Sequence, residues 1–138
     1  MPHDALNATY TPDEHPASVA AAIDVFQRFI AAFNAYDHAA IAEVLHFPHY
    51  RLKGGKIMVW QDAAEYLASA KVRIGPQWQH SVSDFCRPLA ASDDKVHLDV
   101  QWTRFNAEGV PYLRFRALWV MALLDGRWGA QLRSSFEP

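Results

Sequence analysis

The stretch VFQRFIAAFNAYD, residues Val25–Asp37, decides the fold of this chain. Its aromatic residues Phe26, Phe29 and Phe33 recur at the three- and four-residue spacing of one helical face. This spacing predicts a long amphipathic helix over 17–36. A helix with so much aromatic surface needs a large concave partner, and the second half of the chain is strand-like enough to supply one.

Two shorter helices and a β-hairpin are expected next. Asp37 is placed to cap one helix, and Asp62 followed by Glu65 resembles a capping box that opens the other. The pair Gly54-Gly55 is typical of a tight hairpin turn. The predicted ranges are 38–45 and 62–73 for the helices and 49–60 for the hairpin.

The rest of the chain is predicted to form four antiparallel strands, at 78–89, 96–105, 112–124 and 127–136. Alternation of apolar and polar residues is clearest in Val96–Phe105, and Asp125-Gly126 is a strong two-residue hairpin signal. Helices grouped ahead of an antiparallel meander indicate an α+β fold. We expect a curved sheet wrapped around the first helix, with a blind conical pocket between them. Residues 1–16 are expected to be an extended arm before a single domain over 17–138.

Composition narrows the classes of function. The chain has 138 residues, enough for one packed domain, and its hydrophobic fraction of 51% excludes a disordered chain. A formal net charge of −2 gives no electrostatic reason to expect nucleic acid or an anionic membrane as a partner. The single Cys86 excludes an intramolecular disulfide. With no signal peptide at the start and no apolar run of about 20 residues, we expect a cytoplasmic protein.

Three segments carry a resemblance to a known superfamily: FQRFIAAFNAYDHAAIAEVL at Phe26–Leu45, HFPHYRLKGG at His46–Gly55 and DGRWGAQLRSSF at Asp125–Phe136. With the element order, they resemble the nuclear transport factor 2-like cone folds, which include ketosteroid isomerase, scytalone dehydratase and the SnoaL polyketide cyclases. The resemblance implies a homodimer with a pocket for a small, mostly apolar ligand, and an oxyanion or carboxylate on that ligand would be held by Arg51 or Arg133. It also implies cofactor-free isomerase, dehydratase or cyclase chemistry by proton transfer. The alternative is a non-catalytic dimeric binding or accessory protein whose cone is filled by its own aromatic residues.

The functional residues of ketosteroid isomerase do not carry over to this chain. Its oxyanion-hole tyrosine on the first helix matches Phe29, which has no hydroxyl group. Its general-base aspartate matches Arg51 or Lys53, and its second oxyanion donor falls near Trp119. None of the three roles is kept, so steroid isomerisation is not predicted.

Two histidines are the candidates for acid–base catalysis. His80 ranks first, because relatives such as scytalone dehydratase use strand histidines to move protons. His49 shares a strand face with Arg51, at the position where relatives keep their base, and a histidine there could exchange protons near neutral pH. Asp84 shares a face with His80, but four strand residues span ~13 Å, too far for a direct dyad, so Asp84 is instead a candidate ligand-binding residue. The alternative for each is a structural role, with Arg51 paired to a carboxylate and the histidines satisfied or at the surface.

The remaining candidates are expected to line the ligand pocket. Strand parity, taken from the resemblance, turns Gln131 and Arg133 toward the cone, where arginine offers two parallel hydrogen bonds to a carboxylate. Arg104 is expected at the pocket mouth. The large rings are divided between core and pocket wall; those assigned to the pocket are Phe29, Phe33, Trp60, Trp102 and Trp119. No metal site is expected, because the histidines lack ligand spacing, and no glycine-rich phosphate loop occurs.

Overall fold

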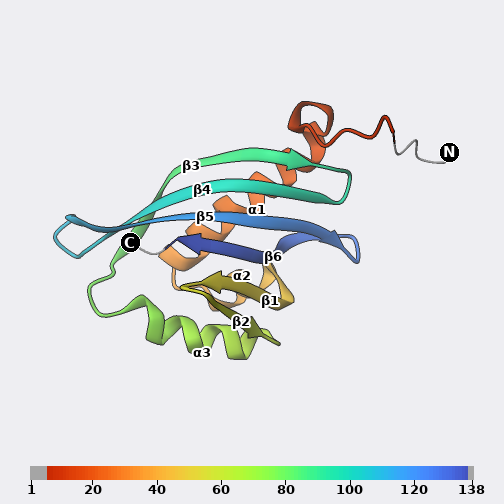
Figure 1. Ribbon diagram of the computed structural model, residues 1–138. Helices are drawn as coiled ribbons and strands as arrows, with labels where there is room; N and C mark the ends of the chain where they lie inside the picture. The colour runs from red at the N-terminus through yellow and green to blue at the C-terminus, as the bar shows by residue number, and fades with distance from the viewer. Residues whose placement is uncertain (1–5, 137–138) are drawn as a thin grey trace.

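The computed structural model describes residues 6–136, so the first five residues of the predicted arm lie outside the described part. That part forms three helices and a six-stranded sheet (Figure 1). The helices are α1 (Pro16–Asn34), α2 (His38–Glu43) and α3 (Ala63–Ile74), preceded by a short 3₁₀ helix at Pro12–Glu14. The strands are β1 (Leu45–Lys53), β2 (Lys56–Trp60), β3 (His80–Ala91), β4 (Lys95–Phe105), β5 (Pro111–Leu124) and β6 (Arg127–Phe136).

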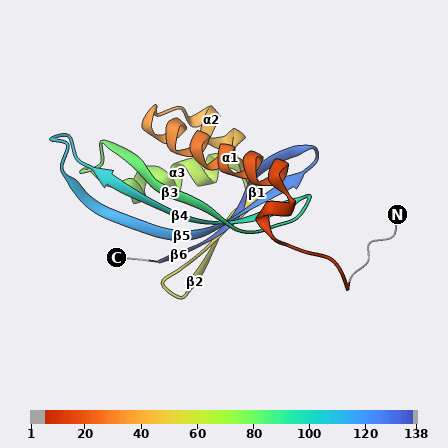
Figure 2. The ribbon, with the colours of Figure 1, turned by 90° about the horizontal axis from the view of Figure 1, so that it is seen from above.

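The sheet is curved, and its strand order is β2-β1-β6-β5-β4-β3. Figure 2 shows all three helices on one side of it, as the predicted α+β cone requires. The sheet is mixed, however, because β1 runs parallel to β6 while the other neighbouring pairs are antiparallel. The parallel pair joins two segments about 80 residues apart, which no local pattern reveals.

The aromatic stripe of α1 packs on the concave face of the sheet. Phe26 and Phe29 are buried there, and each makes an edge-on contact with Trp119 of β5, with ring centroids 5.2 and 4.8 Å apart. By length and hydropathy alone, α1 would also suffice for a membrane span. Its buried stripe is that of a core helix, which confirms the organising role predicted for it.

Side-chain caps begin both shorter helices at the predicted residues. The Asp37 carboxylate accepts a hydrogen bond from the Ala40 amide at 3.1 Å. The Asp62 carboxylate accepts one from the Glu65 amide at 2.9 Å, and the Glu65 carboxylate accepts one in return from the Gln61 amide. This variant of the capping box, in which Glu65 accepts from the amide before the cap residue, fixes the start of α3.

Several boundaries differ by a few residues from those predicted. The second helix ends at Glu43 rather than at 45, and β1 begins at Leu45 rather than at 49. The Val44 carbonyl accepts a hydrogen bond from the Ala130 amide at 2.9 Å, so this apolar stretch joins the sheet. Similarly, β3 begins at His80, which leaves Trp78 in the preceding loop.

Candidate functional site

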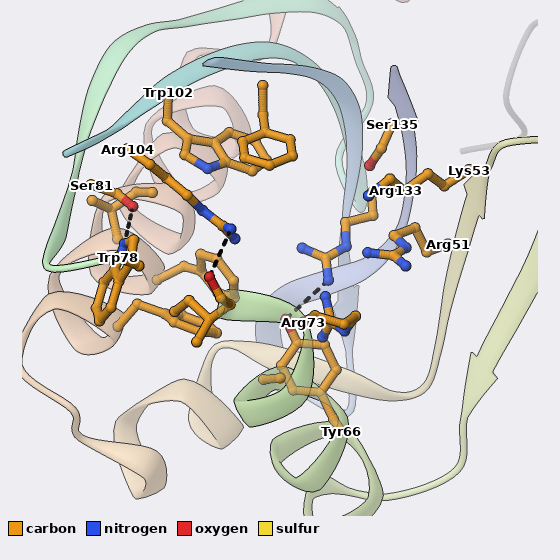
Figure 3. A pocket seen from close by; sticks show the side chains of 16 residues that line it. Arg51, Lys53, Tyr66, Arg73, Trp78, Ser81, Trp102, Arg104, Arg133 and Ser135 are labelled. Carbon is orange, nitrogen blue, oxygen red and sulfur yellow. Dashed lines mark hydrogen bonds between the residues drawn. The ribbon is translucent and has the colours of Figure 1, made fainter. Parts of the chain in front are cut away.

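A partly open cavity of about 80 Å³ lies between α1, α3 and the concave face of the sheet (Figure 3). At roughly 10–15 Å³ for each water, this volume holds about five to eight waters, and because the cavity is partly open a small ligand can extend beyond it. Two larger hollows, of about 370 and 550 Å³, are more open to solvent. Each of those has only one lysine or arginine in its wall, so the smaller cavity is the chemically distinctive one.

The cavity wall is strongly basic. Arg51, Arg73, Arg104, Arg133 and Lys53 all line it, and none of the described residues in its wall carries a carboxylate. The net charge of −2 for the whole chain gives no sign of this concentration of positive charge. The cavity therefore has the electrostatics of an anion site.

Strand pairing and helical spacing explain how the arginines meet. Arg51 of β1 is paired with Arg133 of β6 in the sheet register, so both side chains point to the concave face. On α3, Tyr66, Ala70 and Arg73 stand at positions i, i+4 and i+7, one face of the helix, and all three line the cavity. Tyr66 and Arg73 were not among the predicted site residues, although this spacing could have identified them.

The guanidinium groups pack against aromatic rings. The Cζ atoms of Arg51 and Arg73 lie 5.4 and 5.0 Å from the ring centroid of Trp60. The Cζ atom of Arg133 lies 5.1 Å from the Trp119 ring. These cation–π contacts offset part of the cost of burying the cations.

Several guanidinium nitrogens have no hydrogen-bond partner within residues 6–136. They are Nη2 of Arg73, Nε of Arg104 and Nε of Arg133. Burial lowers the pKa of Arg73 and of Arg104, and the nearby Arg133 guanidinium lowers both further. Buried donors without an acceptor are costly, so an acceptor that enters the cavity would relieve this cost.

Tyr66 is the acidic group that faces these arginines. Its side chain is 1% exposed, and its hydroxyl oxygen accepts a hydrogen bond from Nη2 of Arg133 at 3.0 Å. Burial by itself raises the pKa of the phenol, but the guanidiniums of Arg133 and Arg73 together outweigh burial and lower the pKa of Tyr66 below 10. A phenol in this setting gives up its proton more readily than one in water.

His49 is buried beside the cavity and does not line it. Its Nδ1–H donates to the Ala130 carbonyl at 3.0 Å, and its ring packs edge-on against Tyr66. Burial, and next the charge of Arg133, lower the pKa of His49 from 6.5 to about 3. In this environment His49 stays neutral at neutral pH, which departs from the predicted proton exchange.

The other acid–base candidates lie outside the cavity. His80 stacks on Phe105 with ring centroids 4.9 Å apart, while the next residue, Ser81, points into the cavity. Asp84 accepts a hydrogen bond from the Thr103 hydroxyl at 2.7 Å and lies 3.5 Å from Nε of Arg114. Neither His80 nor Asp84 reaches a ligand in the cavity, because successive strand residues point to opposite faces.

The predicted pocket residues divide into wall and core. The cavity is lined by Phe29, Phe33, Trp102 and Arg104. Trp60 and Trp119 do not line it but make cation–π contacts with the arginines that do. Gln131 does not line the cavity: its side-chain amide donates to the Pro48 carbonyl. The pairing of β6 with β5 shifts at this residue, since Ala130 pairs with Met121 and Leu132 with Val120, so Gln131 departs from the predicted parity.

Two other kinds of chemistry receive no support from the described residues. Burial raises the pKa of the Cys86 thiol to about 11, so the thiolate nucleophile is scarce at neutral pH. Within residues 6–136, no three histidine, cysteine, aspartate or glutamate side chains gather as a metal site.

Comparison with known proteins identifies the fold. No protein-family model matches the chain, and no curated protein matches its sequence. Among solved structures, an NTF2-like protein of unknown function from Pseudomonas putida matches with a TM-score of 0.70 and 13% identity over 89% of this chain and 88% of that one. A ketosteroid isomerase-like protein from Erwinia carotovora atroseptica matches with a TM-score of 0.65 and 17% identity, over 86% and 95%. The hexachlorocyclohexane dehydrochlorinase LinA-type3 from Novosphingobium barchaimii matches with a TM-score of 0.66 and 17% identity, over 87% of this chain and 86% of that one.

This chain thus has the NTF2-like α+β cone fold that the resemblance implied. Proteins of this fold include at least one enzyme, the dehydrochlorinase.

Proposed function

We propose that the protein binds a small, mostly apolar acid in the cavity, with the carboxylate held by Arg73 and Arg133. The observation that carries the proposal is the set of guanidinium donors that lack an acceptor, in a wall where the described residues include no carboxylate. A guanidinium binds a carboxylate through short, charge-assisted hydrogen bonds. The rings of Phe29, Phe33 and Trp102 then contact the apolar part of the ligand.

If the bound acid is converted, the reaction is a cofactor-free proton transfer of the isomerase, dehydratase or cyclase type. Tyr66 is the residue that transfers the proton, because its hydroxyl is at the cavity wall and its pKa is lowered by Arg133 and Arg73. The fold is compatible with such chemistry, since solved structures that share it include a ketosteroid isomerase-like protein and a dehydrochlorinase. The open cavity favours this function over an accessory protein whose cone is filled by its own rings.

The test compares pentanoate with pentanamide, which has the same shape but no charge. Isothermal titration calorimetry at constant ionic strength should show pentanoate binding at least about tenfold more tightly, because charge-assisted hydrogen bonds contribute about 1.5–3 kcal/mol. The matched control is Arg114→Gln, which removes an arginine on the outer face of β5 and should leave this difference intact. Equal affinity for the two compounds, or no binding of either, would contradict the proposal.

We also propose a homodimer through the outer face of β1, β2 and β6. Exposed apolar side chains gather there across paired positions: Tyr50, Leu52, Ile57, Val59 and Leu132. A contiguous exposed apolar patch is typical of a protein contact. In sedimentation experiments the protein should have twice the 15.6 kDa of one chain.

Ile57, which is 72% exposed, provides the variant that tests this contact. Ile57→Glu should give monomers, because it places a charge within the patch, whereas Val82→Glu on the exposed face of β3 should remain dimeric. A monomeric parent protein would rule out the proposed dimer.

A further inference from the structure

The basic groups of the cavity lie at two ends of it. Figure 3 shows Arg51, Arg73 and Arg133 gathered around Tyr66 on one side, whereas Arg104 enters from the opposite side, near Trp78 and Trp102. The first group rests on the Trp60–Tyr66 ring pair, whose centroids are 5.2 Å apart. The cavity wall also contains aromatic rings, those of Phe29, Phe33, Trp78, Trp102 and Phe115.

Arg104 packs against a different pair of aromatic rings. Its Cζ atom lies 4.6 Å from the ring centroid of Phe115, which in turn stacks on Trp102 at 5.3 Å. Its Nη1 donates to the Ile74 carbonyl over a long 3.5 Å, and its Nε has no hydrogen-bond partner among residues 6–136. Arg104 therefore also has a donor available for an acceptor inside the cavity.

The sheet register separates the two ends. Arg104 of β4 pairs with Leu113 of β5, whereas Arg133 of β6 pairs with Trp119 of β5. The two pairing points are six residues apart on β5, about 20 Å at the usual strand rise, and the two arginines stand on opposite sides of that strand. Their long side chains extend back toward each other (Figure 3), and Arg133 is near enough to lower the pKa of Arg104, so a short ligand with an acid group at each end can contact both.

We infer that the preferred ligand is a short diacid, with one acid group on Arg73 and Arg133 and the second on Arg104. This inference rests on the proposed function and names its ligand class more narrowly. The apolar chain between the two acid groups lies against the aromatic wall formed by Phe29, Trp102 and Phe115. Arg104 is then a specificity-determining residue, because it selects ligands by their second acid group.

The experiment measures matched pairs of acids by calorimetry at constant ionic strength: pentanoate with glutarate, and hexanoate with adipate. In each pair the chain length is the same and only the second carboxylate differs. For at least one pair, the parent protein should bind the diacid about tenfold or more tightly than the monoacid. In Arg104→Gln the ratio of diacid affinity to monoacid affinity should fall to near one. Arg104→Lys should keep part of it, because lysine retains the charge but not the planar guanidinium.

The controls separate this inference from the proposed function. Arg114→Gln removes a surface arginine and should keep the parent ratio, which excludes a general effect of net charge. Circular dichroism and thermal melting show whether each variant is folded. If Arg104→Gln does not fold, Arg104→Lys replaces it as the test variant. Monoacid binding with a ratio near one in the parent protein, or an unchanged ratio in both Arg104 variants, would overturn the diacid inference alone. Binding of neither acid would overturn both proposals.

Discussion

Lowering the pH from 7 to 5 should reduce the free energy of unfolding by about 2 kcal/mol through His49 alone. The pKa of this residue is about 3 in the folded protein, against an ordinary value of 6.5 in the unfolded chain. The unfolded state therefore takes up the proton first as the pH falls. Stability from this residue is fully present above pH 6.5 and is lost as the pH falls toward 3.

Urea unfolding measured between pH 7.5 and 4.5 checks this prediction. His49→Asn should flatten the profile, because asparagine can still donate to the Ala130 carbonyl but does not take up a proton. His80→Asn, which alters a histidine stacked on Phe105 away from the cavity, is the matched control and should keep the parent profile. Equal slopes for the parent and His49→Asn would show that His49 is not held neutral.

Replacing Arg133 by methionine should weaken pentanoate binding at least about 100-fold without lowering the stability of the ligand-free protein. The side chain is 5% exposed, and its guanidinium lies close enough to Arg73 to lower the pKa of Arg73. Replacing a whole buried ion pair by apolar residues of similar size is often neutral or stabilising. Arg133 faces other cations and no carboxylate, so its removal leaves no opposite charge buried and should not lower stability. In this variant, binding should therefore fall while stability does not.

Calorimetry with pentanoate and urea unfolding of the same preparation measure the two effects together. Arg114→Gln again serves as the control, since it removes an arginine without touching the cavity. Retained binding in a variant that has lost stability would show that Arg133 is a structural residue and does not hold the ligand.

Most of the fold could be predicted, because its signals are local. The phenylalanine spacing of α1, the capping residues Asp37 and Asp62 and the Gly54-Gly55 turn each act within a few residues of the chain. The errors arose where contacts between segments distant in the sequence determine the secondary structure. Val44 was predicted to lie within the second helix, but it ends α2, and its carbonyl accepts a hydrogen bond from the Ala130 amide where β1 begins at the next residue.

The site could be predicted only in part, for the same reason. Strand parity taken from the resemblance turned Arg133 toward the cavity that it lines, but the same parity failed at Gln131, where the pairing of β6 with β5 shifts. Alternation alone left open which face of β1 Arg51 occupies, and the structure places Arg51 in the cavity wall. The histidines were misjudged because their residue type says nothing of their surroundings. The pKa of His49 depends on burial and on Arg133, which is 84 residues further along the chain.

A crystal structure of the protein with pentanoate tests the central proposal most directly. We expect the carboxylate oxygens within about 3 Å of guanidinium nitrogens of Arg73 and Arg133, with the alkyl chain against the aromatic wall. Pentanoate bound only at the surface, or in the cavity with its alkyl end toward the two arginines, would contradict the proposal that this cavity is an acid-binding site.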